Sequence, residues 1–149
     1  MKKKDNMAFL DLELTHLPMD EPLDAAKDSI LECCVVVTDP DFKELARQKW
    51  VISHTKEKLS SLSEWHQKNF GKEGNDLFAD VLASKTTREE METELLALLK
   101  LHCLENMCRL AGNSVHCDRE VLFHAMPSVY KFCSHQVQLC AHVAGVKRV

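Results

Sequence analysis

The stretch MAFLDLEL at residues 7–14 decides how the rest of the sequence is interpreted. It is short and mostly apolar, and its two acids, Asp11 and Glu13, stand two residues apart. Side chains two residues apart in a β-strand point to the same side, so the stretch predicts a strand with both carboxylates on one face. Such a pair repels unless a positive charge compensates it, and a divalent cation is a usual compensation. Alone, however, the triplet is a weak signal, because any sheet edge can carry two solvated acids.

The segments that follow predict an α/β protein. A second strand is expected over residues 30–38, where β-branched side chains are frequent, and a third strand over about residues 45–54, antiparallel to the second. Between residues 55 and 82 the apolar side chains recur with helical spacing, interrupted once by glycines. This region therefore predicts two short helices.

The clearest helix begins at TTREE, residues 86–90, which offers a capping box. Apolar side chains then recur every three to four residues and give the helix one buried face, formed by Met91, Leu95, Leu98, Leu99 and His102. Residues 109–114 predict a buried strand that ends in a polar turn, and residues 118–126 predict a helix closed by Pro127. Together the elements predict a mixed β-sheet with flanking helices, in a single domain over residues 1–149.

Composition limits the classes of protein that the chain can belong to. Its 149 residues include 19 Lys and Arg against 23 Asp and Glu, a net charge of -4, which argues against holding long nucleic acid through a basic surface. No apolar stretch approaches the roughly 18 residues of a membrane helix, and the start leads into no signal-type apolar core. We therefore expect a soluble cytoplasmic chain with no membrane contact, whose seven cysteines are reduced.

Three stretches together resemble the oligoribonuclease family, whose members remove nucleotides from the 3′ end of very short RNAs with two metal ions. They are DLELT at residues 11–15, SEW at 63–65 and LAGNSVHCD at 110–118, and the match is collinear over about residues 7–135. The resemblance implies the RNase H-like fold of the DnaQ-type, DEDD exonucleases. Measured against the family, the C-terminal part of an exonuclease domain is lacking, and residues 138–149 form a divergent tail.

The resemblance also implies roles for individual residues. Asp11, Glu13 and Asp118 are the expected catalytic carboxylates and the expected ligands of Mg²⁺ or Mn²⁺. Leu17 is expected to wedge between two bases and Trp65 to stack on the substrate, as an aromatic platform does for unpaired bases. The other expected substrate contacts are Leu14, Thr15, Asn113, Ser114 and His116. The last three are also explained by a turn that caps a helix. The implied partners are short single-stranded RNA and a second copy of the chain in a homodimer, in the cytoplasm or, as in some eukaryotes, the mitochondrion.

The sequence departs from the family after Glu120. The family has a general-base histidine and a fourth carboxylate on a late helix, whereas no Asp or Glu follows Glu120 in this chain. His135 and His142 are the candidates to replace the base, because neutral imidazole can accept a proton from water. SHQ at residues 134–136 stands where the family has a His-Tyr-Arg run that contributes to a phosphate pocket across the dimer, so a glutamine replaces an arginine. In addition, the segment between Thr15 and residue 32 is longer than in the family.

These observations leave three interpretations. The first is a 3′-to-5′ exoribonuclease that degrades short oligoribonucleotides to mononucleotides by two-metal-ion phosphodiester hydrolysis. The second is a catalytically inactive relative that binds short RNA or a full-length partner subunit. The third is a zinc site built from the late cysteines and histidines, although their irregular spacing lacks the close pairs that structural zinc uses. Its candidates are Cys103, Cys108, His116, Cys117, His124 and Cys133.

Overall fold

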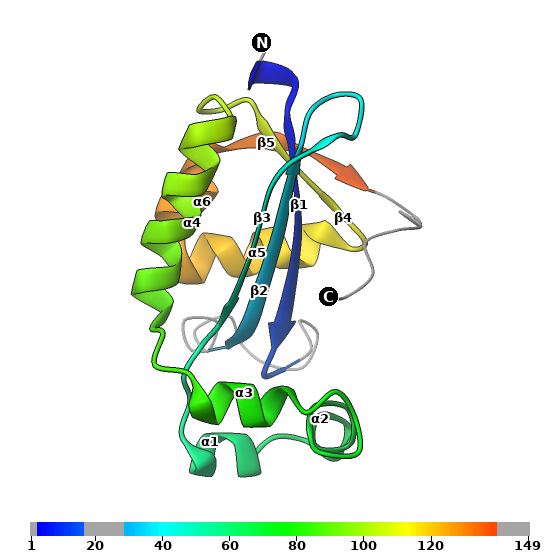
Figure 1. The fold of residues 1–149 in the computed structure, drawn as a ribbon, viewed down its shortest axis with the longest axis vertical. Coiled ribbons are helices and arrows are strands. Elements are labelled where there is room, and N and C mark those ends of the chain that lie inside the picture. The colour runs from blue at the N-terminus through cyan, green and yellow to red at the C-terminus, as the bar shows by residue number, and fades with distance from the viewer. Residues whose placement is uncertain (1–2, 17–28, 140–149) are drawn as a thin grey trace.

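A five-stranded mixed sheet organises the computed structural model, which describes residues 3–16 and 29–139 (Figure 1). The strand order is β3-β2-β1-β4-β5, with β1 in the centre. β1 pairs antiparallel with β2, which pairs antiparallel with β3, whereas the β1–β4 and β4–β5 pairs are parallel. The strands are β1 (Met7–Leu14), β2 (Ile30–Thr38), β3 (Glu44–Val51), β4 (Cys108–Gly112) and β5 (Cys133–Leu139). This is the RNase H-like architecture that the sequence predicts.

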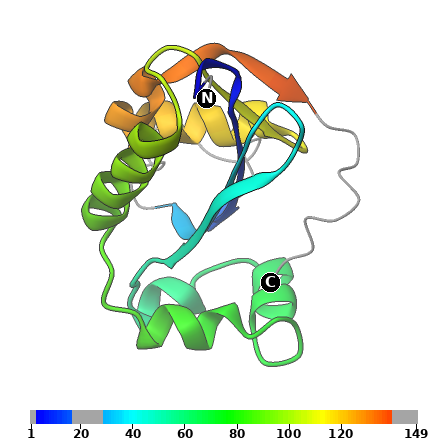
Figure 2. The same ribbon diagram turned by 45° about the horizontal axis from the view of Figure 1, so that its top comes forward.

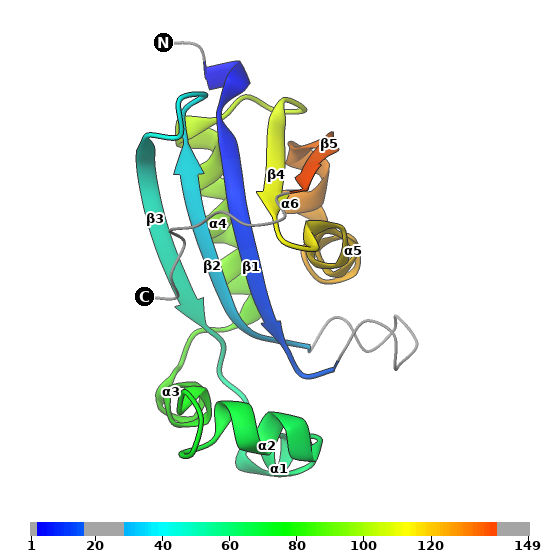
Figure 3. The ribbon, with the colours of Figure 1, turned by 90° about the vertical axis from the view of Figure 1, so that its right-hand side faces the viewer.

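The helices form two groups around this sheet (Figures 2 and 3). The long helix α4 (Arg88–His102), with α5 (Val115–Ala125) and α6 (Pro127–Phe132), covers one face of the sheet. The short helices α1 (Lys56–Ser60), α2 (Glu64–Phe70) and α3 (Leu77–Ala83) lie beyond the end of the sheet where β1 stops. They enclose a separate small core formed by Leu31, Leu59, Phe70, Leu77 and Val81. A short 3₁₀ turn, η1 (Lys3–Asp5), precedes β1.

Alternation along β1 separates the apolar core from the carboxylates. Ala8, Leu10 and Leu12 are buried in the main core, which α4, α5 and α6 share. The residues between them point to the opposite face, where Phe9 belongs to a small apolar cluster with Met7, Val36 and Ala111. Asp11 and Glu13 continue this second face, as their spacing predicts.

Helix α4 confirms its sequence signals. Thr87 accepts a hydrogen bond from the backbone nitrogen of Glu90, whose carboxylate accepts one from the backbone nitrogen of Thr87, and this pair is the predicted capping box. The helix buries Met91, Leu95 and Leu99 against the sheet. The indole nitrogen of Trp50 on β3 donates to Glu94 at 2.6 Å, which ties the helix to the edge of the sheet.

Other elements differ from the sequence-based expectation. Residues 55–82 hold three helices rather than two, because the chain also breaks at the end of α1 near Ser61. Helix α5 begins at Val115, before the expected residue 118. Pro127 ends α5 but also starts α6, since proline fits the first turn of a helix, where its missing N–H needs no partner. Neither α6 nor β5 was expected from the sequence, and β5 includes the first two residues of the expected divergent tail at 138–149.

None of the helices in residues 3–16 and 29–139 combines the length and apolar composition needed to cross a membrane.

Gly112 allows β4 to end close to the central strand. Its φ is +153°, which residues with a side chain rarely adopt. A Cβ at this position would also lie 3.0 Å from the carbonyl oxygen of Leu10 on β1. The close approach and the turn that follows direct the chain into α5, so this glycine helps to place the first turn of that helix next to β1.

We predict that Gly112→Ala lowers the free energy of unfolding by about 1–3 kcal/mol, because the alanine must adopt a strained φ and press on the backbone of β1. Urea unfolding measures the change. Asn113→Ala, in the same turn but exposed and without a positive φ, is the matched control and should have little effect. Equal stability of Gly112→Ala and the unsubstituted chain would contradict this account of the turn.

Candidate functional site

Asp118, in the first turn of α5, connects that helix to the central strand. Its Oδ1 accepts a hydrogen bond from the backbone nitrogen of Leu12 at 3.2 Å, and the residue is only 8% exposed. β4 pairs with β1 only at residues 7–9. The N–H of Leu12 lies beyond this pairing, and the carboxylate of Asp118 satisfies it instead. The contact fixes Asp118 beside the strand that carries Asp11 and Glu13.

The three acids lie close enough to affect one another. Burial raises the pKa of Asp118 to about 7, with the negative charge of Asp11 as the next cause and that of Glu13 as a smaller one. The hydrogen bond from Leu12 opposes this rise without cancelling it. That these acids share one site stays a prediction.

This donor set fits a divalent cation. Mg²⁺ and Mn²⁺ take carboxylate oxygens, and their charge would relieve the repulsion that raises the pKa of Asp118. Asp11, Glu13 and Asp118 are the residues that would hold such an ion. In the described part of the chain, no three His, Cys, Asp or Glu side chains already form an arrangement that could hold a metal ion. The match between these three acids and a divalent cation therefore rests on two properties: carboxylate oxygens are the ligands such a cation takes, and their negative charges repel one another.

His66 anchors α2 to the end of β1, a role that the sequence analysis did not identify. Its Nε2 donates to the carbonyl oxygen of Leu14 at 3.1 Å, because a carbonyl can only accept. Its Nδ1 therefore accepts from the hydroxyl of Ser63, at 2.6 Å. The three-residue spacing of Ser63 and His66 at the start of a predicted helix was the available sequence signal.

The anchor brings Trp65 to the end of the sheet where the carboxylates lie. Trp65 contacts His66 and Phe70 edge-on, with ring centroids 5.2 and 5.5 Å apart, and remains 51% exposed. An aromatic ring with an exposed surface can stack against a base. The hydrogen bond of His66 therefore holds α2, the helix that carries Trp65, at the end of β1 (Figure 1).

The remaining residues expected at the end of β1 are placed only in part. Leu14 is half-buried, and its carbonyl is the one that His66 binds. Thr15 is buried, and its backbone nitrogen donates to the carbonyl oxygen of Ser29 at 2.7 Å. Leu17 lies outside the described residues.

Asn113 and Ser114 form the exposed turn between β4 and α5. Ser114 takes the N-cap position with a φ of 54°, yet its side chain makes no hydrogen bond to the first turn of the helix. The turn thus leads into the helix, as the alternative interpretation expects, but the side chain of Ser114 does not cap it. Both side chains stand at the surface about one helical turn before Asp118, and their contact with substrate stays a prediction.

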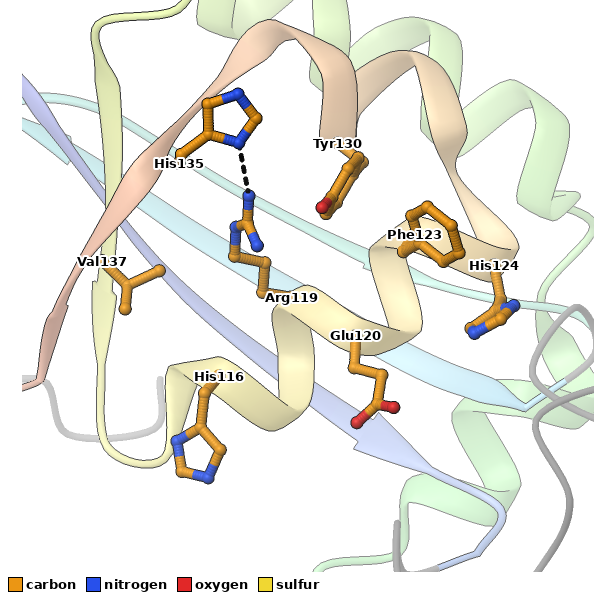
Figure 4. A pocket seen from close by; sticks show the side chains of 8 residues that line it. All are labelled: His116, Arg119, Glu120, Phe123, His124, Tyr130, His135 and Val137. Atoms are coloured by element: carbon orange, nitrogen blue, oxygen red, sulfur yellow. Dashed lines mark hydrogen bonds between the residues drawn. The ribbon is translucent and has the colours of Figure 1, made fainter.

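His116 lies on the other side of α5 from Asp118. It lines an open cavity of about 550 Å³ between α5, α6 and β5 (Figure 4). In the cavity the guanidinium of Arg119 lies 4.5 Å from the ring centre of Tyr130, and its Nη2 is 3.5 Å from Nδ1 of His135. His135, a candidate replacement for the family's base, therefore faces this cavity rather than the carboxylates. His142, the other candidate, lies outside the described residues.

The expected zinc ligands separate into two places. Cys103, Cys108 and Cys133 are buried together, whereas His116, Cys117 and His124 lie on α5. Hydrogen bonding to Cys103 and Cys133, together with burial, raises the pKa of Cys108 far above its ordinary value. In the part of the chain that the structure describes, these side chains form no group of three that could hold a metal ion. All six cysteines in the described residues are free thiols, as expected of a reduced chain.

We predict that the free energy of unfolding falls in mild acid and that His66 contributes to this fall. Burial is the largest cause that lowers the pKa of His66 in the folded chain, and the nearby His16 adds to it, while the Leu14 carbonyl opposes the change. The unfolded chain therefore takes up a proton at a higher pH than the folded one, and stability falls as the pH drops below about 6.5. Urea unfolding at about pH 7.5 and about pH 5.5 should show a smaller loss in His66→Gln than in the unsubstituted chain. Equal losses would contradict the prediction.

Comparison with known proteins shows several relatives of one kind, although no family model matches the chain. The chain is 33% identical to a probable oligoribonuclease of Dictyostelium discoideum over 99% of its own length and 73% of the relative's. It is 30% identical to a probable oligoribonuclease of Caenorhabditis elegans, over 98% of this chain and 70% of the relative. The mitochondrial oligoribonuclease of Mus musculus is 34% identical, over 88% of this chain but only about half, 52%, of the mouse protein. These likenesses agree with the fold, and the chain belongs to the oligoribonuclease family.

Proposed function

We propose that the chain is a 3′-to-5′ exoribonuclease that degrades short oligoribonucleotides to mononucleotides with two divalent metal ions. The observation that supports this most is the convergence of Asp11, Glu13 and Asp118 from β1 and α5, with the pKa of Asp118 raised to about 7. Membership of the oligoribonuclease family supports the same conclusion.

The described residues divide the work between the reacting end and the bases. Asp11, Glu13 and Asp118 bind Mg²⁺ or Mn²⁺ on a rigid strand and helix, which keeps their oxygens in a fixed arrangement. A bound divalent cation stabilises charge on a phosphoryl oxygen and makes water a stronger nucleophile. Trp65 offers its exposed ring to a terminal base, and Asn113 and Ser114 lie at the surface where a phosphate can reach them.

Short single-stranded RNA suits the charge of the chain. A net charge of -4 does not favour a long electrostatic track, whereas one stacked base and a metal-bound phosphate need only a small contact area. A homodimer and a cytoplasmic location stay predictions, as does the mitochondrial alternative. The name of the mouse relative includes the word mitochondrial.

A second function, RNA or partner binding without hydrolysis, is favoured by two observations. Residues 121–149 contain no Asp or Glu. His135 faces the cavity beside Arg119, on the other side of α5 from Asp118. Without a base beside the metal centre, proton transfer loses about 10²–10⁴-fold in rate.

We predict that the full chain with Mn²⁺ shortens a 5′-labelled RNA of a few nucleotides stepwise from its 3′ end. Asp11→Asn should reduce the rate by about 10²-fold or more, because the substitution removes a cation ligand and misplaces the reacting groups. Gel electrophoresis of timed samples measures both rates. Asp80→Asn, an exposed acid on α3, is the matched control. An RNA that stays intact would favour the non-hydrolytic function, and equal rates for Asp11→Asn and the unsubstituted chain would point to a contaminating nuclease.

We predict that Trp65→Ala weakens binding of a short RNA by about 1–3 kcal/mol, or roughly 5- to 150-fold in Kd, because one stacked base loses its platform. Fluorescence anisotropy in the Asp11→Asn background measures Kd without cleavage. Trp65→Phe should retain much of the affinity, and Leu82→Ala, a similarly exposed apolar residue on α3, should not change it. A Trp65→Ala protein that binds RNA normally would show that the ring has only a structural role.

A further inference from the structure

His66 is a buried ionisable side chain that the proposed hydrolysis does not use. It is only 4% exposed, and both of its ring nitrogens are engaged. Nε2 donates to the carbonyl oxygen of Leu14 at 3.1 Å, and Nδ1 accepts from the hydroxyl of Ser63 at 2.6 Å. One donor and one acceptor on the ring describe neutral imidazole, because the protonated ring carries two donors. These contacts therefore fit one protonation state and one tautomer.

Ser63 contacts His66 instead of capping its own helix. It occupies the N-cap position of α2, where a serine side chain usually accepts a hydrogen bond from the backbone of the first turn. In this helix the side chain makes no such bond, and its hydroxyl donates to Nδ1 of His66. The start of α2 is thus arranged around the imidazole rather than around the end of the helix.

The imidazole also supports the ring of Trp65. The two ring centroids lie 5.2 Å apart with an angle of 85° between the planes. Phe70 contacts both rings, with its centroid 5.5 Å from that of Trp65 and 5.7 Å from that of His66. Phe70 is packed in the small core of the short helices, and the hydrogen bond of His66 to Leu14 ties the three rings to β1. The placement of the exposed Trp65 ring relative to the end of β1 therefore depends on His66.

A proton on His66 works against this arrangement. The added N–H meets a hydroxyl that donates to Nδ1, and the charge is largely shielded from water. The titratable group that acts on it from beyond the end of β1 is His16, and a positive charge there opposes one on His66. On α2 itself the charged residues Glu64 and Lys68 are exposed. Burial first, and then His16, lower the pKa of His66, although its hydrogen bond to the carbonyl of Leu14 opposes them.

We propose that His66 is a positioning residue for RNA: its neutral ring holds Trp65 where a terminal base can stack, and protonation of the ring loosens that hold. The affinity for RNA then falls in mild acid through the contact with the base rather than through the contact with the phosphate. The inference rests on the proposed function, because it takes short RNA as the substrate and Trp65 as the platform for a base.

Fluorescence anisotropy with a short oligouridine tests the proposal in the Asp11→Asn background, where cleavage is suppressed. Uracil has no basic ring nitrogen, and the label is a dye that does not titrate. With His66 intact, the protein should bind about 5-fold more weakly at about pH 5.5 than at about pH 7.5, as part of the stacking on Trp65 is lost. His66→Gln keeps an N–H for the Leu14 carbonyl but takes up no proton, so it should lose this change. Asp118 titrates in both proteins, and the difference between their pH profiles isolates His66.

Three further variants separate positioning from a general structural role. Ser63→Ala, at an exposed position, removes the hydroxyl that fixes the tautomer and should bind RNA several-fold more weakly at about pH 7.5. In Trp65→Ala, His66→Gln should have no further effect, because no platform remains to be held. His54→Gln is the matched control. His54 also bonds a backbone carbonyl, that of Ile30 at 2.8 Å, but it lies between β3 and α1, so both Kd and pH profile should be unchanged.

The outcomes for His66 and for the proposed function are separable. Equal pH profiles with His66 intact and in His66→Gln, or an effect of His66→Gln that persists in Trp65→Ala, would overturn the role of His66 alone. A protein that binds no oligouridine at about pH 7.5 with His66 intact would overturn the proposed function together with this inference. Urea unfolding at both pH values checks that each variant is folded. If His66→Gln is not, Ser63→Ala decides alone, with weaker binding in favour and unchanged binding against.

Discussion

The hydrogen bond from the backbone nitrogen of Leu12 to the carboxylate of Asp118 is the interaction on which the candidate site depends. It exists because β4 stops pairing with β1 after residue 9 and turns away at Gly112, which leaves a strand N–H for the first turn of α5 to satisfy. Burying a carboxylate is costly unless hydrogen bonds or positive charge compensate it. One backbone hydrogen bond compensates the burial of Asp118 only in part, so the pKa of its carboxyl is raised.

The nearest positively charged residue in the sequence, Arg119, does not neutralise the carboxylate of Asp118. Arg119 follows Asp118 directly, but successive helical residues point about 100° apart, and its guanidinium stacks on Tyr130 in the cavity outside α5. None of the ion pairs found in the described residues involves Asp118. Helix α5 thus separates the carboxylate of Asp118, on the side that faces the sheet, from the guanidinium of Arg119, on the opposite side.

The sequence predicted the features that depend on a local pattern of residues, such as the alternation along a strand or the start of a helix. Alternation placed Asp11 and Glu13 on one face of β1, and the capping box located the start of α4. The sequence did not predict features that depend on how two strands pair. A shift of the pairing by one residue moves every side chain of a strand to the other face of the sheet, and local patterns do not fix this register. Glu32 lies in an apolar run, and only its pairing with Glu13 reveals its neighbours. Similarly, Pro127 signals the end of a helix equally well whether or not another helix begins there, which explains why α6 and then β5 were not foreseen.

Binding and hydrolysis make different demands on this site. In the proposed function, the carboxylates of β1 and α5 supply oxygen donors for the cation, and the exposed ring of Trp65 supplies a surface for a base. A proton acceptor is a separate requirement. His54 and His66 are engaged by backbone carbonyls, and His135 faces the other side of α5, so these three do not replace the family's late histidine. Because a bound cation would lower the pKa of water by itself, the proposed hydrolysis without that base would be slower by about 10²–10⁴-fold rather than impossible.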